Sequence, residues 1–167
     1  KIYSNHLEPD ERALGNLRAR IRANIIYYYA NLKNYLVLGT SDKSEYLIGY
    51  FTKFGDGSAD ILPIAELYKT QLREFAKFIG VPNNIITKRS SPNLWKGHYA
   101  EEEIGIEYEK IDTILYCMLE QQYTLNKFLD EITGISKKDV EKIYQMYQNT
   151  QHKRILPERV GIIHGDF

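Results

Sequence analysis

The chain has 167 residues, with 43 % hydrophobic and 26 % charged side chains, an ordinary composition for a globular chain. Its 22 basic and 22 acidic residues balance, so no bulk charge draws it to nucleic acid or to a membrane. A single cysteine, Cys117, excludes an internal disulfide framework, and no apolar run reaches the ~20 residues that span a bilayer, so the cytoplasm is the expected compartment.

The first predicted element is a long helix. Proline and acids at residues 8–11 are typical of a helix start. Apolar side chains then recur at intervals of three and four along one face, at Leu14, Leu17, Ile21, Ile25, Tyr28 and Leu32. The consecutive tyrosines 27–29 are of a kind enriched where protein surfaces meet. The flank with Arg18, Arg20 and Arg22 is either solvated or able to grip phosphate or carboxylate.

A strand, a turn and a second helix follow. Residues 35–38 are predicted to form a short buried strand, and residues 39–41 turn the chain into the helix. Asp42 and Glu45 have the spacing of a capping box. Ligands of open α/β sheets sit at the carboxyl ends of strands, which indicates a site at Thr40 that could hold a nucleotide and Mg²⁺. The simpler alternative is that Ser41 and Asp42 only cap the helix and Glu45 is solvated.

The middle of the chain alternates loops and short elements. Residues 54–60 have the glycines and acids of a loop, and their spacing does not fit a calcium-binding EF-hand. A helix is predicted at residues 70–79, with Gly80 as its stop. We expect a short strand at residues 85–87 and irregular structure at residues 88–105.

Helices are predicted from Tyr108 to the end of the chain. Cys117 lies in an apolar run, where a buried and unreactive thiol is favoured. The last helix begins at the N-cap Ser136 and runs to the basic residues 151–154. Those cations either suit a helix C-terminus or form an anion-binding cluster.

Taken together, these segments resemble NAD synthetases, which are ATP pyrophosphatases. The similar segments occur in the family's order at residues 15–20, 39–45, 51–60, 63–69, 90–95 and 152–154. The similarity in the run through Gly57 and Asp60 is specific to this family and is poorly explained by chance. The resemblance implies an α/β fold: part of a parallel-sheet, Rossmann-like ATP pyrophosphatase domain with a helical C-terminal portion.

The resemblance also implies an activity. In this family ATP adenylates the nicotinate carboxylate of deamido-NAD, and ammonia attacks the acyl adenylate to give NAD and AMP. It assigns Thr40, Lys69 and Ser91 to ATP and Glu45 to Mg²⁺. It assigns the dinucleotide substrate to a larger set, Arg20, Lys53, Asp60, His152 and Lys153. No side chain is required as a nucleophile, because the substrate carboxylate attacks. Ser91 aligns only after a small gap.

One family feature does not occur in these residues. The Ser-Gly-Gly-x-Asp-Ser loop that grips the ATP phosphates is missing, and the chain begins at Lys1 without an initiator methionine. We therefore expect residues 1–167 to be a single domain that is incomplete at its N-terminus and inactive alone. The intact protein is expected to be a homodimer through the helix at residues 10–33, by resemblance to the family and from its tyrosines.

Two other functions remain open. Another amide-forming or thiolation ATP pyrophosphatase would keep the ATP residues but need not keep Arg20, Asp60, His152 and Lys153. A helical dimerisation module would use the tyrosine-rich first helix and no catalysis. Binding of deamido-NAD, of ATP alone, or of neither separates the three. Whether ammonia is free or comes from a glutaminase is not determined by these residues.

Overall fold

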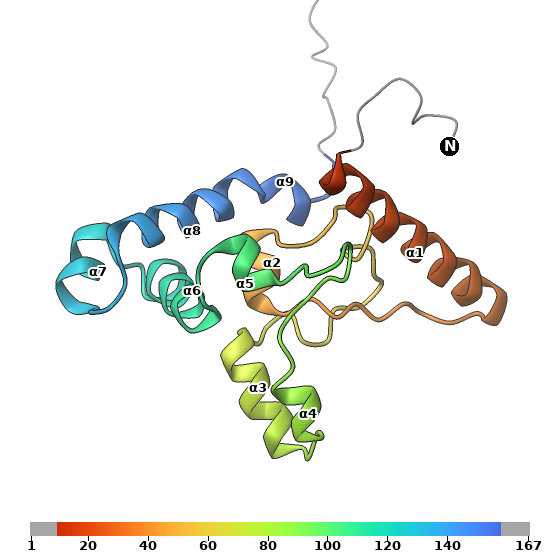
Figure 1. Ribbon diagram of the computed structural model, residues 1–167, viewed down its shortest axis with the longest axis horizontal. Helices are drawn as coiled ribbons and strands as arrows, with labels where there is room; N and C mark the ends of the chain where they lie inside the picture. The colour runs from red at the N-terminus through yellow and green to blue at the C-terminus, as the bar shows by residue number, and fades with distance from the viewer. Residues whose placement is uncertain (1–9, 158–167) are drawn as a thin grey trace, which may run out of the picture.

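The computed structural model describes residues 10–157, and most of them lie in helices (Figure 1). In chain order the elements are α1 (Glu11–Lys33), α2 (Lys43–Ile48), α3 (Lys69–Phe78), α4 (Asn83–Ile86), α5 (Ala100–Ile104), α6 (Tyr108–Leu115), the π-helical turn η1 (Tyr116–Glu120), α7 (Leu125–Glu131), α8 (Lys137–Asn149) and α9 (Gln151–Arg154).

Helix α1 begins as predicted, because the Asp10 side chain accepts a hydrogen bond from the backbone N–H of Ala13. It ends at Asn34 in the left-handed conformation. Its buried positions are all small: Gly15, Ala19, Ala23 and Ala30. The large apolar side chains at positions 14, 17, 21, 25, 28 and 32 form the predicted stripe, but they are exposed. The stripe therefore does not face this chain's own core.

The predicted buried strand at residues 35–38 is wrong for the part of the chain that the structure describes. Only one parallel bridge forms, between Leu38 and Ile61, and Val37 alone is buried. Leu36 and Leu38 are 66 % and 60 % exposed. The Gly39 N–H donates to the carbonyl of Ile61 at 2.8 Å, and the Asp60 N–H donates to Val37 at 2.9 Å. A strand becomes buried only where neighbours cover both its faces and its edges, and residues 10–157 cover this segment only around Val37 and along the edge at residues 60–61.

The core lies between the helices after residue 100 and α2. Its fully buried side chains come from α5, α6, α7 and α8, with Ile48 from α2, and include Ile104, Tyr108, Ile111, Ile114, Leu115, Phe128, Val140 and Ile143. The predicted cap of α8 is confirmed, since Ser136 and Asp139 form a reciprocal capping box. Cys117 is buried against this core, as predicted, and burial raises the pKa of its thiol.

Two predictions between residues 79 and 105 are corrected. Residues 85–87 do not form a strand; α4 covers residues 83–86 and begins after Pro82, whose fixed φ suits a helix start. The region 88–105 is irregular only to residue 99, because α5 follows. Its acidic triplet, residues 101–103, occupies the first turn, where negative charge is favoured. Helix α3 lies within one residue of its prediction, although none of its residues is buried.

Figure 1 shows α1 at the right of a centre formed by α2, α5 and α6, and the pair α3–α4 below it. Loops run between α1 and this centre. None of the helices within residues 10–157 combines the length and apolar character needed to cross a membrane.

Candidate functional site

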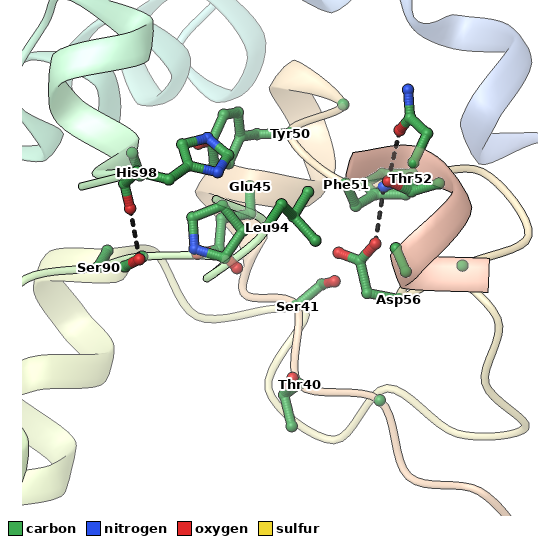
Figure 2. Close-up of a pocket in the computed structure, with 18 of the residues that line it drawn as sticks. Thr40, Ser41, Glu45, Tyr50, Phe51, Thr52, Asp56, Ser90, Leu94 and His98 are labelled. Carbon is green, nitrogen blue, oxygen red and sulfur yellow. Dashed lines mark hydrogen bonds between the residues drawn. The ribbon is translucent and has the colours of Figure 1, made fainter. Parts of the chain in front are cut away.

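A cavity of about 860 Å³ opens between α1, α2 and the loops that join the elements. Its lining includes Thr40, Glu45, Lys69 and Ser91, which come from separate segments of the sequence. Figure 2 shows Thr40, Ser41 and Glu45 following one another along the cavity, with Tyr50 and His98 on one side and Thr52 and Asp56 on the other. All residues predicted for ATP and Mg²⁺ therefore line one cavity.

The cavity wall at Glu45 is built by the start of α2. The Asp42 carboxylate accepts from the Glu45 N–H at 2.9 Å, and the Glu45 carboxylate accepts from the Asp42 N–H at 3.3 Å. The predicted capping box is thus confirmed. Because Glu45 also lines the cavity, the capping role and a ligand-facing position are compatible in this residue.

Lys69 lies between two carboxylates. Its ammonium is 2.5 Å from Asp42 and 2.9 Å from Glu45. Asp42 is 0 % exposed, and a buried carboxylate needs a cation beside it. Burial, followed by the charge of Asp42, raises the pKa of Glu45 although Lys69 opposes this. Burial disfavours the charged form of Lys69, yet Glu45 and Asp42 raise its pKa, so the ammonium stays charged.

Ser91 enters the cavity from the loop at residues 90–98. Its hydroxyl donates to the backbone carbonyl of His98, and it accepts from the Asn93 N–H at 3.2 Å. The hydroxyl is therefore fixed by its own loop. This loop also lines the cavity with Pro92, Leu94 and Trp95.

Three of the five residues predicted for the dinucleotide substrate lie together outside this cavity lining. The Arg20 guanidinium donates to the carbonyl of Lys53 at 3.2 Å, and the Lys53 ammonium donates to the carbonyl of His152. These bonds connect α1, the loop after α2 and α9. His152 is exposed. The structure thus brings Arg20, Lys53 and His152 to one place beside the cavity.

The other two predicted residues, Asp60 and Lys153, form hydrogen bonds elsewhere in the chain. The Asp60 carboxylate accepts from the Val37 N–H at 2.7 Å and from the Tyr27 hydroxyl at 3.4 Å, which ties it to α1 and to the segment before Gly39. The Lys153 ammonium donates to the carbonyls of Gly49 at 2.7 Å and Phe51 at 2.8 Å. Burial lowers the pKa of Lys153. Lys153 lines the cavity but holds the end of α2 in place.

Sequence reasoning missed a second buried group in the cavity wall. His98 is 4 % exposed, and its Nε2 lies 2.6 Å from the Glu103 carboxylate. The Tyr50 hydroxyl donates to the same carboxylate at 2.8 Å. Although burial opposes it, the bonds from His98 and Tyr50 lower the pKa of Glu103. The loop around His98 has no periodicity, so no sequence signal separated it from a solvated loop.

This chain is similar in sequence and in structure to known proteins. Residues 1–157 match the family model described as NAD synthase. The chain belongs to the NAD synthase family. This confirms the family predicted from the sequence. The chain resembles solved NAD synthetases, which have an α/β fold, so the predicted α/β class is confirmed. Residues 10–157 do not themselves form the predicted parallel sheet, because they contain a single parallel bridge.

Several NAD synthase relatives match most of this chain. An NH(3)-dependent NAD(+) synthetase of Staphylothermus marinus is 56 % identical over 143 residues, which is 86 % of this chain and 52 % of that protein. The enzyme of the same description in Aeropyrum pernix is 51 % identical over 90 % of this chain and 52 % of its own length. The chain thus spans about half the length of these curated relatives.

Solved structures of related enzymes are also similar to this chain. The NMN synthetase from Francisella tularensis is 38 % identical, with a TM-score of 0.76 over 92 % of this chain and 58 % of that one. An NH3-dependent NAD synthetase from Campylobacter jejuni is 29 % identical, with a TM-score of 0.73 over 96 % of this chain and 60 % of that one.

Proposed function

We propose that this chain is the C-terminal part of an ammonia-dependent NAD synthetase. The enzyme would amidate deamido-NAD to NAD through an acyl adenylate, releasing AMP and pyrophosphate. The observation that carries this proposal is the single cavity lined by Thr40, Glu45, Lys69 and Ser91, four residues that the family resemblance assigns to ATP and its metal.

The residues in the cavity suit adenylyl transfer. Negative charge develops on the attacked phosphorus and on the departing pyrophosphate, and a lysine or Mg²⁺ stabilises it where it develops. Lys69 supplies the cation, and its pKa is raised by Glu45 and Asp42 against the effect of burial. The Thr40 and Ser91 hydroxyls line the same cavity. The attacking group is the substrate carboxylate, so we assign no side chain as a nucleophile.

Glu45 fits a role as one Mg²⁺ ligand. Mg²⁺ is usually bound by one or two carboxylates together with substrate phosphates and water. Within residues 10–157 no three potential ligands of this kind converge on one point. Glu45 would therefore share the ion with the ATP phosphates and with the phosphate-binding loop that the family carries outside these residues. The Lys69 ammonium would have to move from Glu45 as the ion binds.

The dinucleotide would lie beside the ATP cavity. We assign it to Arg20, Lys53, Asp60, His152 and Lys153, with Arg20, Lys53 and His152 already adjacent. We further propose that the intact protein is a homodimer through α1. In support, the exposed stripe on this helix includes Leu17, Ile21 and Ile25, which are about half exposed. A contiguous apolar surface of this kind is typical of an association site.

We also propose that residues 1–167 belong to one domain with a parallel sheet. The single parallel bridge between Leu38 and Ile61 would then be part of that sheet, and the exposed Tyr35 and Leu36 would be covered by the rest of it. The cytoplasm remains the proposed compartment, because the one cysteine gives no disulfide framework.

A second candidate product is NMN, because the similar Francisella tularensis structure is described as an NMN synthetase. The test uses the full-length protein with ATP, Mg²⁺ and ammonium. Formation of NAD from deamido-NAD is expected, with slower or no formation of NMN from nicotinate mononucleotide. Thermal stabilisation by ATP but not by deamido-NAD would favour another ATP pyrophosphatase, and stabilisation by neither would favour an interaction module.

A further inference from the structure

Two arginines of α1 hold the loop that brings Ser91 to the cavity. Arg18 donates to the backbone carbonyl of Leu94. Arg22 donates to the carbonyls of Pro92 at 3.4 Å and Asn93 at 3.0 Å. Three consecutive carbonyls of the loop thus face one helix, and each accepts from a guanidinium. Arginine suits this arrangement because its planar fork reaches two neighbouring acceptors.

The loop turns at the residue whose carbonyl Arg22 binds. Asn93 has a φ of +50°, in the left-handed region that asparagine adopts more readily than most side chains other than glycine. In this conformation its N–H donates to the Ser91 hydroxyl at 3.2 Å, and the Ser91 hydroxyl is also 3.2 Å from the Asn93 side-chain oxygen. The position of Ser91 therefore depends on the turn at Asn93, and Arg22 binds the carbonyl of that turn.

Packing along the same side of α1 adds to these bonds. A Cβ at Gly15 would lie 3.0 Å from the Trp95 ring and 3.2 Å from Leu94, so the glycine allows the loop to approach the helix closely. The Trp95 ring stacks on His98 with centroids 3.4 Å apart. One turn earlier, Arg12 donates to Glu103 at 3.2 Å. The contacts of α1 thus run from Arg12, which binds α5, to Arg22, which binds the loop.

We propose that Arg18 and Arg22 are positioning residues for nucleotide binding, which they support by holding residues 91–94 in the conformation that places Ser91 at the cavity. This inference rests on the proposed function. Arg18 is not part of the cavity lining, so its effect on a nucleotide must pass through the loop. Arg22 lines the cavity and could also touch phosphate directly, which makes Arg18 the cleaner test.

A lysine can replace the hydrogen bond of Arg18 to the loop better than it can replace those of Arg22. Arg18 makes one bond to one carbonyl, which a lysine ammonium can also make. Arg22 reaches two adjacent carbonyls, which a single ammonium does less well. Arg18→Lys should therefore restore nucleotide binding, whereas Arg22→Lys should restore it only in part.

The experiment uses the full-length enzyme. For Arg18→Ala we expect the ATP dissociation constant to rise roughly tenfold, since a hydrogen bond from a charged donor is lost. The deamido-NAD constant should change less than about twofold. Amides of residues 91–98 should exchange faster with deuterium. Lys77→Ala, an exposed lysine on α3, is the matched loss of charge, and it should leave all three measurements at wild-type values.

Two results would overturn the proposal. One is an unchanged ATP constant for Arg18→Ala in an active enzyme. The other is an equal loss of ATP and deamido-NAD binding together with a lower melting temperature, which would indicate general damage. Sedimentation must show the same oligomeric state as wild type. Failure of the proposed function is distinguished separately, because the wild-type enzyme would then not form NAD.

Discussion

Single charged residues in this structure are engaged with the protein before any ligand arrives. The Lys153 ammonium is bound to two backbone carbonyls, and the Lys69 ammonium lies between two carboxylates. Both were expected to face substrates. Their contacts imply that ligand binding and local stability are coupled at these residues, so that each substitution has a stability readout as well as a binding readout.

For Lys153→Ala we expect a lower stability of the full-length protein. Two charge-assisted hydrogen bonds to Gly49 and Phe51 are lost, and the residue is partly exposed, so the cost should be about 1–3 kcal/mol. Urea unfolding measures this, with Lys138→Ala on the exposed side of α8 as the control. Unchanged stability with a weaker deamido-NAD affinity would instead mean that Lys153 leaves the carbonyls to bind substrate.

For Glu45 we expect Mg²⁺ activation to depend on pH. Burial and Asp42 raise its pKa, so Glu45 holds a proton at pH values where a free glutamate is already ionised. The proton stabilises the folded form on the acid side, and this contribution is lost as the pH rises through the raised pKa. Mg²⁺ needs the ionised form. The Mg²⁺ concentration for half-maximal activity should therefore fall as the pH rises through that range.

Glu45→Gln is the matching variant. It should raise the Mg²⁺ requirement, remove its pH dependence in that range and leave the circular dichroism spectrum unchanged, since the amide can still accept from the Asp42 N–H. Activity and Mg²⁺ response equal to wild type would reduce Glu45 to a helix-capping residue.

At the scale of elements, the ends of helices position the cavity more than their interiors do. Helix α2 has only six residues, yet its start carries Asp42 and Glu45 and its end carries Gly49, to whose carbonyl Lys153 is bound. Helix α1 has two faces of different chemical character. Its arginine face holds the loop of Ser91, and its apolar face is exposed.

Gly49→Ala should be strongly destabilising. Gly49 has a φ of +66°, and a Cβ there would lie 2.2 Å from the Cβ of Thr150 at the junction of α8 and α9. Backbone strain and overpacking together should cost about 2–4 kcal/mol. Gly134→Ala is the control, because its φ is +80° but no atom lies within 4 Å, so only the backbone cost of about 1–2 kcal/mol applies. Equal melting temperatures for the two variants would contradict this close contact.

Charges on the exposed stripe of α1 should dissociate the proposed homodimer. Ile21→Glu with Ile25→Glu places two like charges on each subunit at the stripe, and the dimer dissociation constant should rise at least tenfold, about 1.4 kcal/mol. Sedimentation equilibrium of the full-length protein measures it. Asn31→Glu, exposed but outside the stripe, should leave the dimer intact. A stable wild-type monomer at micromolar concentration would rule out this interface.

At the scale of the whole molecule, residues 10–157 bury their apolar side chains on one side and leave several apolar side chains exposed on another. The helices after residue 100 enclose the hydrophobic core, whereas Tyr35, Leu36, Leu38 and Ile61 are exposed around the parallel bridge. An apolar surface of this kind on a single chain is unusual. It fits a chain that spans about half the length of its relatives.

Residues 1–167 produced alone should therefore form no NAD and should associate. The family's phosphate-binding loop is not among them, and the apolar surface of Tyr35, Leu36, Leu38 and Ile61 is uncovered. A sensitive assay of NAD formation and light scattering at increasing concentration check both statements, with the full-length protein as the control. Turnover by the 167 residues alone would contradict the need for the missing loop.

The sequence by itself determined the features that depend on local chemistry. The caps at Asp42 and Ser136 are predicted because a side chain and a backbone N–H three residues away can satisfy each other without other parts of the chain. The family was also predicted from the sequence, because its residues recur in order along nearly the whole chain. These signals need no knowledge of what lies nearby in space.

Only the tertiary structure decided what each face and each charge contacts. The stripe on α1 was predicted as one apolar face, but burial of Gly15, Ala19 and Ala23 instead turned the small residues inward, because they allow the closest approach of the loops. The strand at residues 35–38 lacked covering neighbours, and residues 83–86 became helical after Pro82. The bonds of Lys153, and of Arg22 to the loop, join residues far apart in sequence, so no local pattern encodes them.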